Sequence, residues 1–180
     1  MTHLPIRTER ITIRVPTLDD VDAVQNAKEA REELLRRWMS WADDYGMSHE
    51  ATVKWITDAA QNENFVPLIA VDNTNGNFVL SSGLDADAEG YSRISTGWWL
   101  SDGYEGRGFA YEAMAAIYEF MDTVINAHTV EAAFYAGNTR SRNLMERLGM
   151  TYVGMEHQTH TSHLTGELMD VITYRKTFRS

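Results

Sequence analysis

The stretch Trp98-Trp99-Leu100-Ser101, followed after three residues by Glu105-Gly106-Arg107-Gly108-Phe109-Ala110, joins a predicted strand to a predicted helix through a glycine turn. A helix N-terminus presents backbone N–H groups without intrahelical partners and a partial positive charge, so this order of elements is typical of anion sites. Gly106 and Gly108 carry no side chain, which lets the backbone come close to a phosphate. The turn therefore predicts a phosphate-binding site.

Other phosphate-binding loops do not fit this turn. It lacks the Gly-Lys-Ser/Thr ending of a P-loop, and a dinucleotide fingerprint would need glycine where Tyr111 stands. These departures disfavour nucleotide hydrolysis and hydride transfer. Because an isolated Gly-x-Gly often makes only a tight turn, the flanking sequence has to decide between a structural turn and a binding site.

The sequence after the turn predicts a helix and then alternating strands and helices. Apolar residues repeat at helical spacing for about four turns, at Ala110, Ala113, Met114, Ile117, Met121 and Val124. Strands are predicted at 129–135, 152–155 and 168–178, and a helix at 140–148, which Gly149 ends.

The sequence before the turn is richer in consecutive strands. A strand is predicted at 10–15, with Thr17 as the N-cap of a following helix. Further helical spacing precedes residue 39 and recurs between 48 and 63. A hairpin of strands 65–71 and 78–84 leads to the strand 92–100. Together these elements predict an α+β (α/β) fold, with a mixed, mostly antiparallel sheet of about seven strands flanked by helices. No repeat or linker interrupts it, so residues 1–180 are predicted to form a single domain.

Composition narrows the class of protein. The formal net charge of -10 disfavours nucleic-acid binding and suits a cationic partner such as an amine. No apolar run reaches the roughly 20 residues that span a bilayer, and the N-terminus lacks a signal-peptide pattern, so we expect a cytoplasmic protein without membrane contact. Cysteine is absent, which excludes disulfides, thiolate nucleophiles and cysteine-ligated zinc. The histidines at 157, 160 and 163 lack an accompanying ligand set, so no metal is predicted.

Four segments in this order closely resemble the GNAT acetyltransferase superfamily: Trp98–Ser101, Glu105–Ala113, Asn138–Ser141 and Leu148–Met150. The resemblance runs from Thr8 to about Tyr174. The strand Arg10–Arg14, the cluster Trp38–Trp41 and Asp170 resemble the RimJ/RimL branch, which acetylates the N-termini of ribosomal proteins and, in other members, other amines.

The resemblance implies a GNAT fold in which the fourth and fifth strands splay, here 92–100 and 129–135. The opened wedge would admit the pantetheine arm of acetyl-CoA, and the amides of the glycine turn would hold its pyrophosphate. The residues implied to bind this co-substrate are Trp99, Leu100, Ser101, Glu105, Gly106, Arg107, Gly108, Phe109, Ala110, Asn138, Ser141 and Asn143.

One implied contact is unusual. Glu105 stands where the superfamily usually has Gln or Arg, and a carboxylate buried beside two phosphates would be repelled. We therefore expect its side chain to point to solvent while its backbone serves the site. Arg107, Arg140 and Arg142 are candidates to neutralise the phosphates, although all three are equally compatible with solvated surface positions.

The implied catalytic residues are Asn138 and Ser141. Asn138 matches the asparagine that hydrogen-bonds coenzyme A in the superfamily, and it also suits the N-cap of the following helix. Many members carry a tyrosine as proton donor to the leaving thiolate where this chain has Met145, and the resemblance suggests Ser141 as the substitute.

The general base is open. The branch often has an acid where Ser95 stands. Asp85, Asp87, Glu89 and Glu156 are the remaining candidates, and a water-mediated route is equally compatible. An α-amino group has a pKa of about 7.7 to 8.0, well below about 10.4 for lysine, so it needs less help from a general base to lose its proton. The lack of an obvious dedicated base therefore favours N-terminal or small-molecule amines over lysine as acceptors.

The acceptor site is assigned to Trp38, Trp41 and Asp85, while Trp55 is assigned to the core. The predicted function is acetyl transfer from acetyl-CoA to a primary amine, at a protein N-terminal α-amino group, by direct attack in a ternary complex. Acetylation of a small-molecule amine such as a polyamine, amino sugar or antibiotic stays open, as does a non-catalytic acyl-CoA-binding module. The sequence is also compatible with a homodimer.

Overall fold

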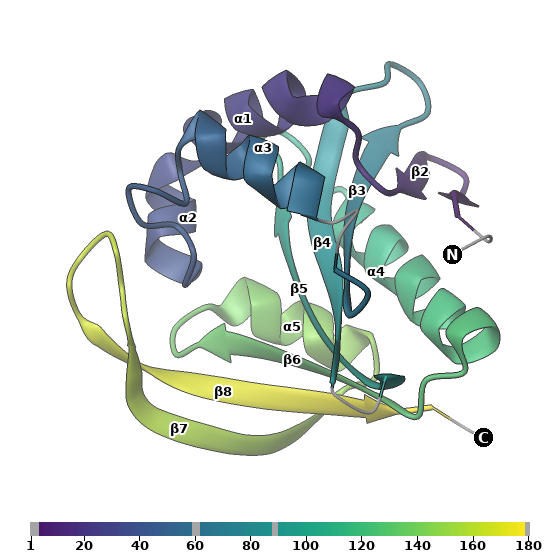
Figure 1. The fold of residues 1–180 in the computed structure, drawn as a ribbon. Coiled ribbons are helices and arrows are strands. Elements are labelled where there is room, and N and C mark those ends of the chain that lie inside the picture. The colour runs from purple at the N-terminus through teal and green to yellow at the C-terminus, as the bar shows by residue number, and fades with distance from the viewer. Residues whose placement is uncertain (1–3, 59–61, 88–89, 179–180) are drawn as a thin grey trace.

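The computed structural model describes residues 4–58, 62–87 and 90–178, and these form an eight-stranded sheet in the order β1-β2-β3-β4-β5-β6-β8-β7 (Figure 1). The strands are β1 (Ile6–Arg7), β2 (Ile11–Arg14), β3 (Phe65–Asp72), β4 (Phe78–Asp87), β5 (Gly90–Leu100), β6 (Thr129–Tyr135), β7 (Thr151–Thr161) and β8 (Leu168–Thr177). Only β5 and β6 pair in parallel; every other neighbouring pair among the described strands is antiparallel. The predicted mixed sheet is confirmed, and the short β1 is the strand that the sequence pattern missed.

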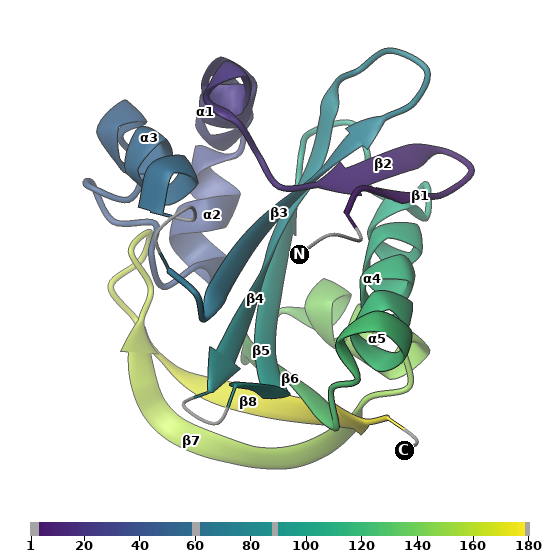
Figure 2. The same ribbon diagram turned by 45° about the vertical axis from the view of Figure 1, so that its right-hand side comes forward.

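Helices cover both faces of the sheet. The helices are α1 (Val21–Ala30), α2 (Glu32–Trp38), α3 (His49–Asp58), α4 (Phe109–Phe120) and α5 (Thr139–Arg147), and α4 continues into a π-helical turn, Met121–Ile125. Helices α1 to α3 lie on one side of β3–β5, and α4 and α5 lie on the other (Figure 2). The chain is therefore an α+β protein of the predicted class.

Strand alternation divides the core in two. Leu84 and Ile94 face α4 in the larger cluster, whereas Ile69, Phe78 and Trp99 face α1 to α3 in the smaller one. This alternation follows from the two-residue period of side chains along a strand. One face of β4 and β5 is therefore covered by α4, and the other face is turned toward α1 to α3.

Several local predictions are confirmed at residue level. The carboxylate of Asp20 accepts a hydrogen bond from the Thr17 N–H at 2.7 Å, although a 3-10 turn, Leu18–Asp20, precedes α1. Gly149 follows α5 with a φ of 78°, a conformation that favours glycine at a helix end. Strand β7 is longer than predicted. In the described part of the chain, no helix is both long and apolar enough to cross a membrane.

Candidate active site

The sheet opens between β5 and β6. These two strands pair at three positions, the last of which is Ser95 with Glu131. Beyond that row, β5 stays paired with β4 as far as Leu100, and β6 with β8 as far as Tyr135. The facing edges of β5 and β6 are thus free of each other from Thr96 onward, as predicted for the splayed strands.

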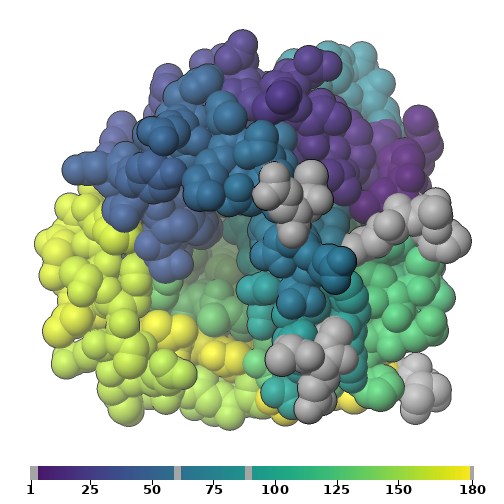
Figure 3. Space-filling view, viewed as in Figure 1, coloured from purple at the N-terminus to yellow at the C-terminus, as the bar shows by residue number. Residues whose placement is uncertain are grey.

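A cavity of about 730 Å³ lies over this opening. Its wall combines residues of α1 to α3 and the segment between α2 and α3 with residues of β4, β5, β6, β8 and α5. In the space-filling view the hollow lies between the N-terminal helices, the central strands and the C-terminal hairpin (Figure 3). One continuous space therefore connects the splayed strands with the helices on the other side of the sheet.

The glycine turn lies at the end of β5 and starts α4. Gly106 and Gly108 have φ values of 71° and 83°, in the left-handed region that side chains disfavour, and Gly108 is the N-cap of α4. The first backbone N–H groups of α4, directly after Gly108, have no carbonyl acceptor within the helix. The turn thus has the geometry of a phosphate site, although its residues lie outside the cavity wall.

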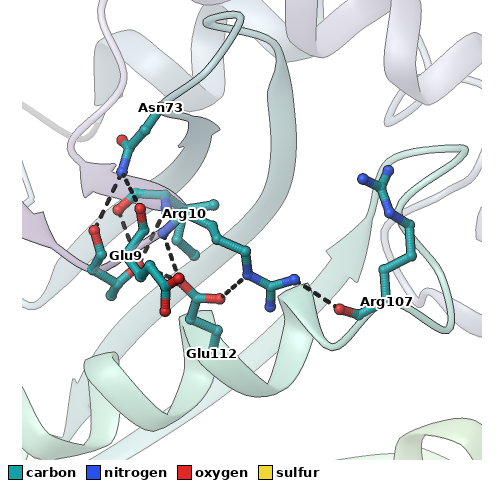
Figure 4. Close-up of polar contacts among 7 residues, drawn as sticks. Glu9, Arg10, Asn73, Arg107 and Glu112 are labelled. Atoms are coloured by element: carbon teal, nitrogen blue, oxygen red, sulfur yellow. Dashed lines mark hydrogen bonds and ion pairs between the residues drawn. The ribbon is translucent and has the colours of Figure 1, made fainter.

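Arg10, immediately before β2, holds this turn against the first turn of α4 (Figure 4). Its guanidinium donates to the carbonyl oxygen of Arg107 at 2.9 Å and to Glu112 of α4 at 2.6 Å. Glu112 also accepts from the Thr8 hydroxyl at 2.5 Å and from the Arg10 backbone N–H at 3.0 Å. Burial alone would raise the pKa of Glu112, but these donors outweigh it and hold the pKa below its ordinary value.

Glu105 does not point to solvent, so that expectation is wrong. Its carboxylate forms an ion pair with Arg31, whose guanidinium also lies 3.2 Å from Asp102. Only 28% of the Glu105 side chain and 12% of the Arg31 side chain is exposed. The acid beside the predicted phosphate site is therefore neutralised by a cation from the junction of α1 and α2.

Two of the three candidate phosphate cations stand outside the ion pairs of the described residues, although the Arg107 charge acts on the Asp72 carboxylate. Within the described residues, neither Arg107 nor Arg140 forms an ion pair, and both are exposed. The Arg107 guanidinium donates to the Gly103 carbonyl at 3.2 Å. Arg142 is instead bonded to Glu146 at 2.8 Å, which raises its pKa. Arg107 and Arg140 remain the better candidates.

Asn138 and Ser141 meet at the start of α5. The Asn138 side chain accepts a hydrogen bond from the Ser141 N–H at 3.2 Å, so the N-cap prediction is confirmed. Both residues line the cavity, as does Met145, which is fully buried. Asn143 lies on the exposed side of α5, outside the cavity wall.

Tryptophans line the cavity both on β5 and on the side of α2 and α3. Trp38, Trp41 and Trp99 all line the cavity, and the rings of Trp41 and Trp99 lie 6.5 Å apart. Trp55 is half-buried and lines the same space. Trp55 packs against the smaller core cluster, as predicted, and the α3 face that carries it also borders the cavity.

Lys28 is a cavity residue that the sequence did not reveal. The side chain is buried, and its Nζ donates to the Gly46 carbonyl and to the Thr52 hydroxyl, each at 2.7 Å. Burial lowers its pKa to about 8. Lysine on an amphipathic helix usually reaches solvent, so helical spacing alone could not have indicated this position.

The hairpin between β7 and β8 closes the side of the cavity. His163 Nε2 lies 2.8 Å from the Ser40 carbonyl oxygen, and the His160 ring stacks on Tyr135 with centroids 3.8 Å apart. Burial, aided by His163, lowers the pKa of His160. His160 and His163 thus pack the hairpin against two residues of the cavity wall, Tyr135 and Ser40. The described residues contain no group of three or more side chains arranged to hold a metal ion.

The candidate bases are dispersed. Asp85 lies in the cavity wall, while Asp87 and Glu156 do not, and Glu89 lies outside the described residues. Glu131, which the sequence analysis did not single out, also lines the cavity. Its position in the middle of a predicted strand was the only available signal.

Comparisons with known proteins agree with this geometry. The family described as "Acetyltransferase (GNAT) domain" matches residues 10–151. No curated protein sequence matches the chain. Among solved structures, the RimL ribosomal L7/L12 alpha-N-protein acetyltransferase in complex with coenzyme A is similar with a TM-score of 0.85 at 17% identity, over 95% of this chain and 96% of that one.

Two further solved structures have the same fold. The ribosomal-protein-S5-alanine acetyltransferase from Vibrio fischeri aligns with a TM-score of 0.83 at 16% identity, over 97% of this chain and 96% of that one. The spermidine N-acetyltransferase from Vibrio cholerae, in complex with CoA and spermine, aligns with a TM-score of 0.80 at 14% identity, over 94% and 96% of the two chains. At these identities, the likeness establishes the fold.

Proposed function

Because the chain belongs to the GNAT acetyltransferase family, we propose that it transfers the acetyl group of acetyl-CoA to the α-amino group of a protein or peptide N-terminus. The observation that carries this proposal is the single cavity joining the splayed ends of β5 and β6 to the tryptophan wall. A co-substrate arm in the wedge and an amine against the tryptophans would meet within it.

The donor half of the site fits acetyl-CoA. The turn offers backbone N–H groups at a helix N-terminus, and Arg107 and Arg140 offer exposed positive charge for phosphates. From Thr96 to Leu100, β5 pairs with β4 but not with β6, and this open edge suits the amides of a pantetheine arm. Acetyl-CoA supplies an activated thioester. The role of the protein is then to position the two substrates, to neutralise charge and to move protons.

Ser141 is the proposed proton donor to the departing sulfur. It lines the cavity at the first turn of α5, where the Asn138 side chain caps its backbone N–H. A thiol has a reference pKa of about 8.5, so its thiolate is a tolerable leaving group and a hydroxyl donor suffices. Asn138 is the residue that fixes this turn of α5.

The charges of the acceptor half favour an amine with one positive charge. The acids in the cavity wall are Asp85 and Glu131, and Glu131 is engaged by Arg175 at 2.6 Å. A polyamine carries several separated ammonium groups and would leave most of them unpaired among tryptophans. This supports a peptide N-terminus, the acceptor class of the ribosomal-protein enzymes, over spermidine.

An acceptor panel with a thiol-release assay tests the proposal. We expect turnover with peptides that have free N-termini, none with the same peptides N-terminally blocked, and at least a tenfold lower kcat in Ser141→Ala. Turnover on polyamines or amino sugars with none on peptides would overturn the acceptor. Coenzyme A binding by calorimetry without thiol release on any acceptor would point to a non-catalytic binding module.

A further inference from the structure

One row of side chains crosses the sheet at the point where it opens. Asp85 on β4 is the register partner of Ser95 on β5, Ser95 is the partner of Glu131 on β6, and Glu131 is the partner of Arg175 on β8. Register partners project to the same face of a sheet, about 5 Å apart. Asp85, Ser95 and Glu131 all line the cavity. The row therefore forms the floor of the cavity at the apex of the wedge.

The two acids of this row differ in their surroundings. Glu131 accepts a hydrogen bond from the Arg175 Nε at 2.6 Å and contacts a second guanidinium nitrogen of the same residue. Both contacts fall on Oε1, so the Glu131 carboxylate is engaged by Arg175 in a charge-assisted pair. Glu131 is thus already paired with a cation of the neighbouring strand.

Asp85 is not held by a guanidinium or by any other cation of the described residues. Its side chain is exposed to the cavity, and among the described residues it forms no ion pair or side-chain hydrogen bond. Lys28 is the cationic residue among the described cavity-lining residues, and its Nζ is directed to Gly46 and Thr52. Ser95, between the two acids, is too short to block the space above it.

We infer that Asp85 is the general base of this site, receiving across Ser95 the proton that the acceptor nitrogen loses. The inference rests on the proposed acetyl transfer. A neutral amine attacks the thioester carbon, the N–C bond forms and the C–S bond breaks. One proton passes from the nitrogen to the Asp85 carboxylate and then to solvent, and the thiolate takes a proton through Ser141. The proposed base and acid thus stand on different elements of the cavity wall, β4 and α5.

Isosteric substitution tests the assignment. Asp85→Asn should lower kcat about 100-fold, in the range of general-base contributions, and leave the dissociation constant of acetyl-CoA unchanged. The matched control is Asp87→Asn, the same change two residues away on the same strand but outside the cavity wall, which should retain wild-type kcat. A second substitution, Ser95→Asp in the Asp85→Asn variant, restores a carboxylate to the row. It should raise kcat at least tenfold above that of Asp85→Asn alone.

Three outcomes would overturn the inference: Asp85→Asn with kcat within threefold of wild type, an equal loss in Asp87→Asn, or a loss that appears only in Glu131→Gln. Each leaves the proposed function intact, since that depends on wild-type turnover. Conversely, if the wild-type protein releases no thiol with any acceptor, the proposed function fails before the variants are compared.

Discussion

The Glu105 carboxylate is ion-paired with Arg31, across a gap of 74 positions in the chain. Arg31 is the N-cap residue of α2, and α2 ends at Trp38 in the cavity wall. The same guanidinium also reaches Asp102 at the start of the glycine turn. One cation thus joins the turn proposed to hold phosphates to the helix that carries an acceptor-site tryptophan.

This pair predicts a non-additive effect on acetyl-CoA binding. Arg31→Gln should weaken binding about tenfold, because it leaves an uncompensated carboxylate beside the phosphates. Adding Glu105→Gln to that variant should restore most of the affinity, since the repelling charge is then gone. Calorimetric titration measures both, with Arg36→Gln, which removes a similar ion pair on α2, as the control. A double variant that binds as weakly as Arg31→Gln would contradict the electrostatic explanation.

The left-handed glycine at the start of α4 predicts a second effect. Gly108→Ala should cost about 1–2 kcal/mol of stability, because a Cβ disfavours a φ of 83°, and should weaken acetyl-CoA binding. Gly76→Ala is the matched control, since Gly76 has a φ of 74° in the β3–β4 turn and open space around its Cα. Both variants should lose similar stability in denaturant titrations. Equal acetyl-CoA affinity in the two would show that the turn does not contribute to binding.

Trp41 should determine acceptor affinity. The side chain is 39% exposed at the cavity rim, so Trp41→Ala should raise the KM for a peptide acceptor about tenfold, through lost apolar contact. The KM for acetyl-CoA should stay unchanged. Tyr45→Ala removes a neighbouring exposed aromatic ring that does not line the cavity and should change neither constant. A Trp41→Ala variant with wild-type acceptor KM would remove Trp41 from the acceptor site.

Lys28 predicts a pH dependence of stability. Its folded-state pKa of about 8 lies below the unfolded value, so the unfolded chain binds more protons between about pH 8 and pH 10.4. The free energy of unfolding of the wild type should therefore rise relative to Lys28→Met across this window, by at most about 1.4 kcal/mol per pH unit. Lys54→Met is the control, because the exposed Lys54 is paired with Asp58, which raises its pKa. A pH-independent difference between wild type and Lys28→Met would contradict the burial of the charge.

The sequence by itself determined the features that are local in the chain. The hairpin at 72–77, the helix after Gly108, the N-caps at Thr17 and Asn138 and the stop at Gly149 all depend on a few consecutive residues. Backbone torsion preferences and side-chain periodicity act over one or two turns, so they can be read from the sequence directly.

Only the tertiary structure decided which side chains meet. The Arg31–Glu105 pair, the burial of Lys28 and the row from Asp85 to Glu131 join residues that are tens of positions apart. Such meetings depend on strand register and on helix packing, where a shift of one residue turns a side chain to the opposite face. The sequence therefore identified the donor turn and the family. The fold determined how Glu105 of that turn is neutralised and which cavity carboxylate stands outside the ion pairs of the described residues.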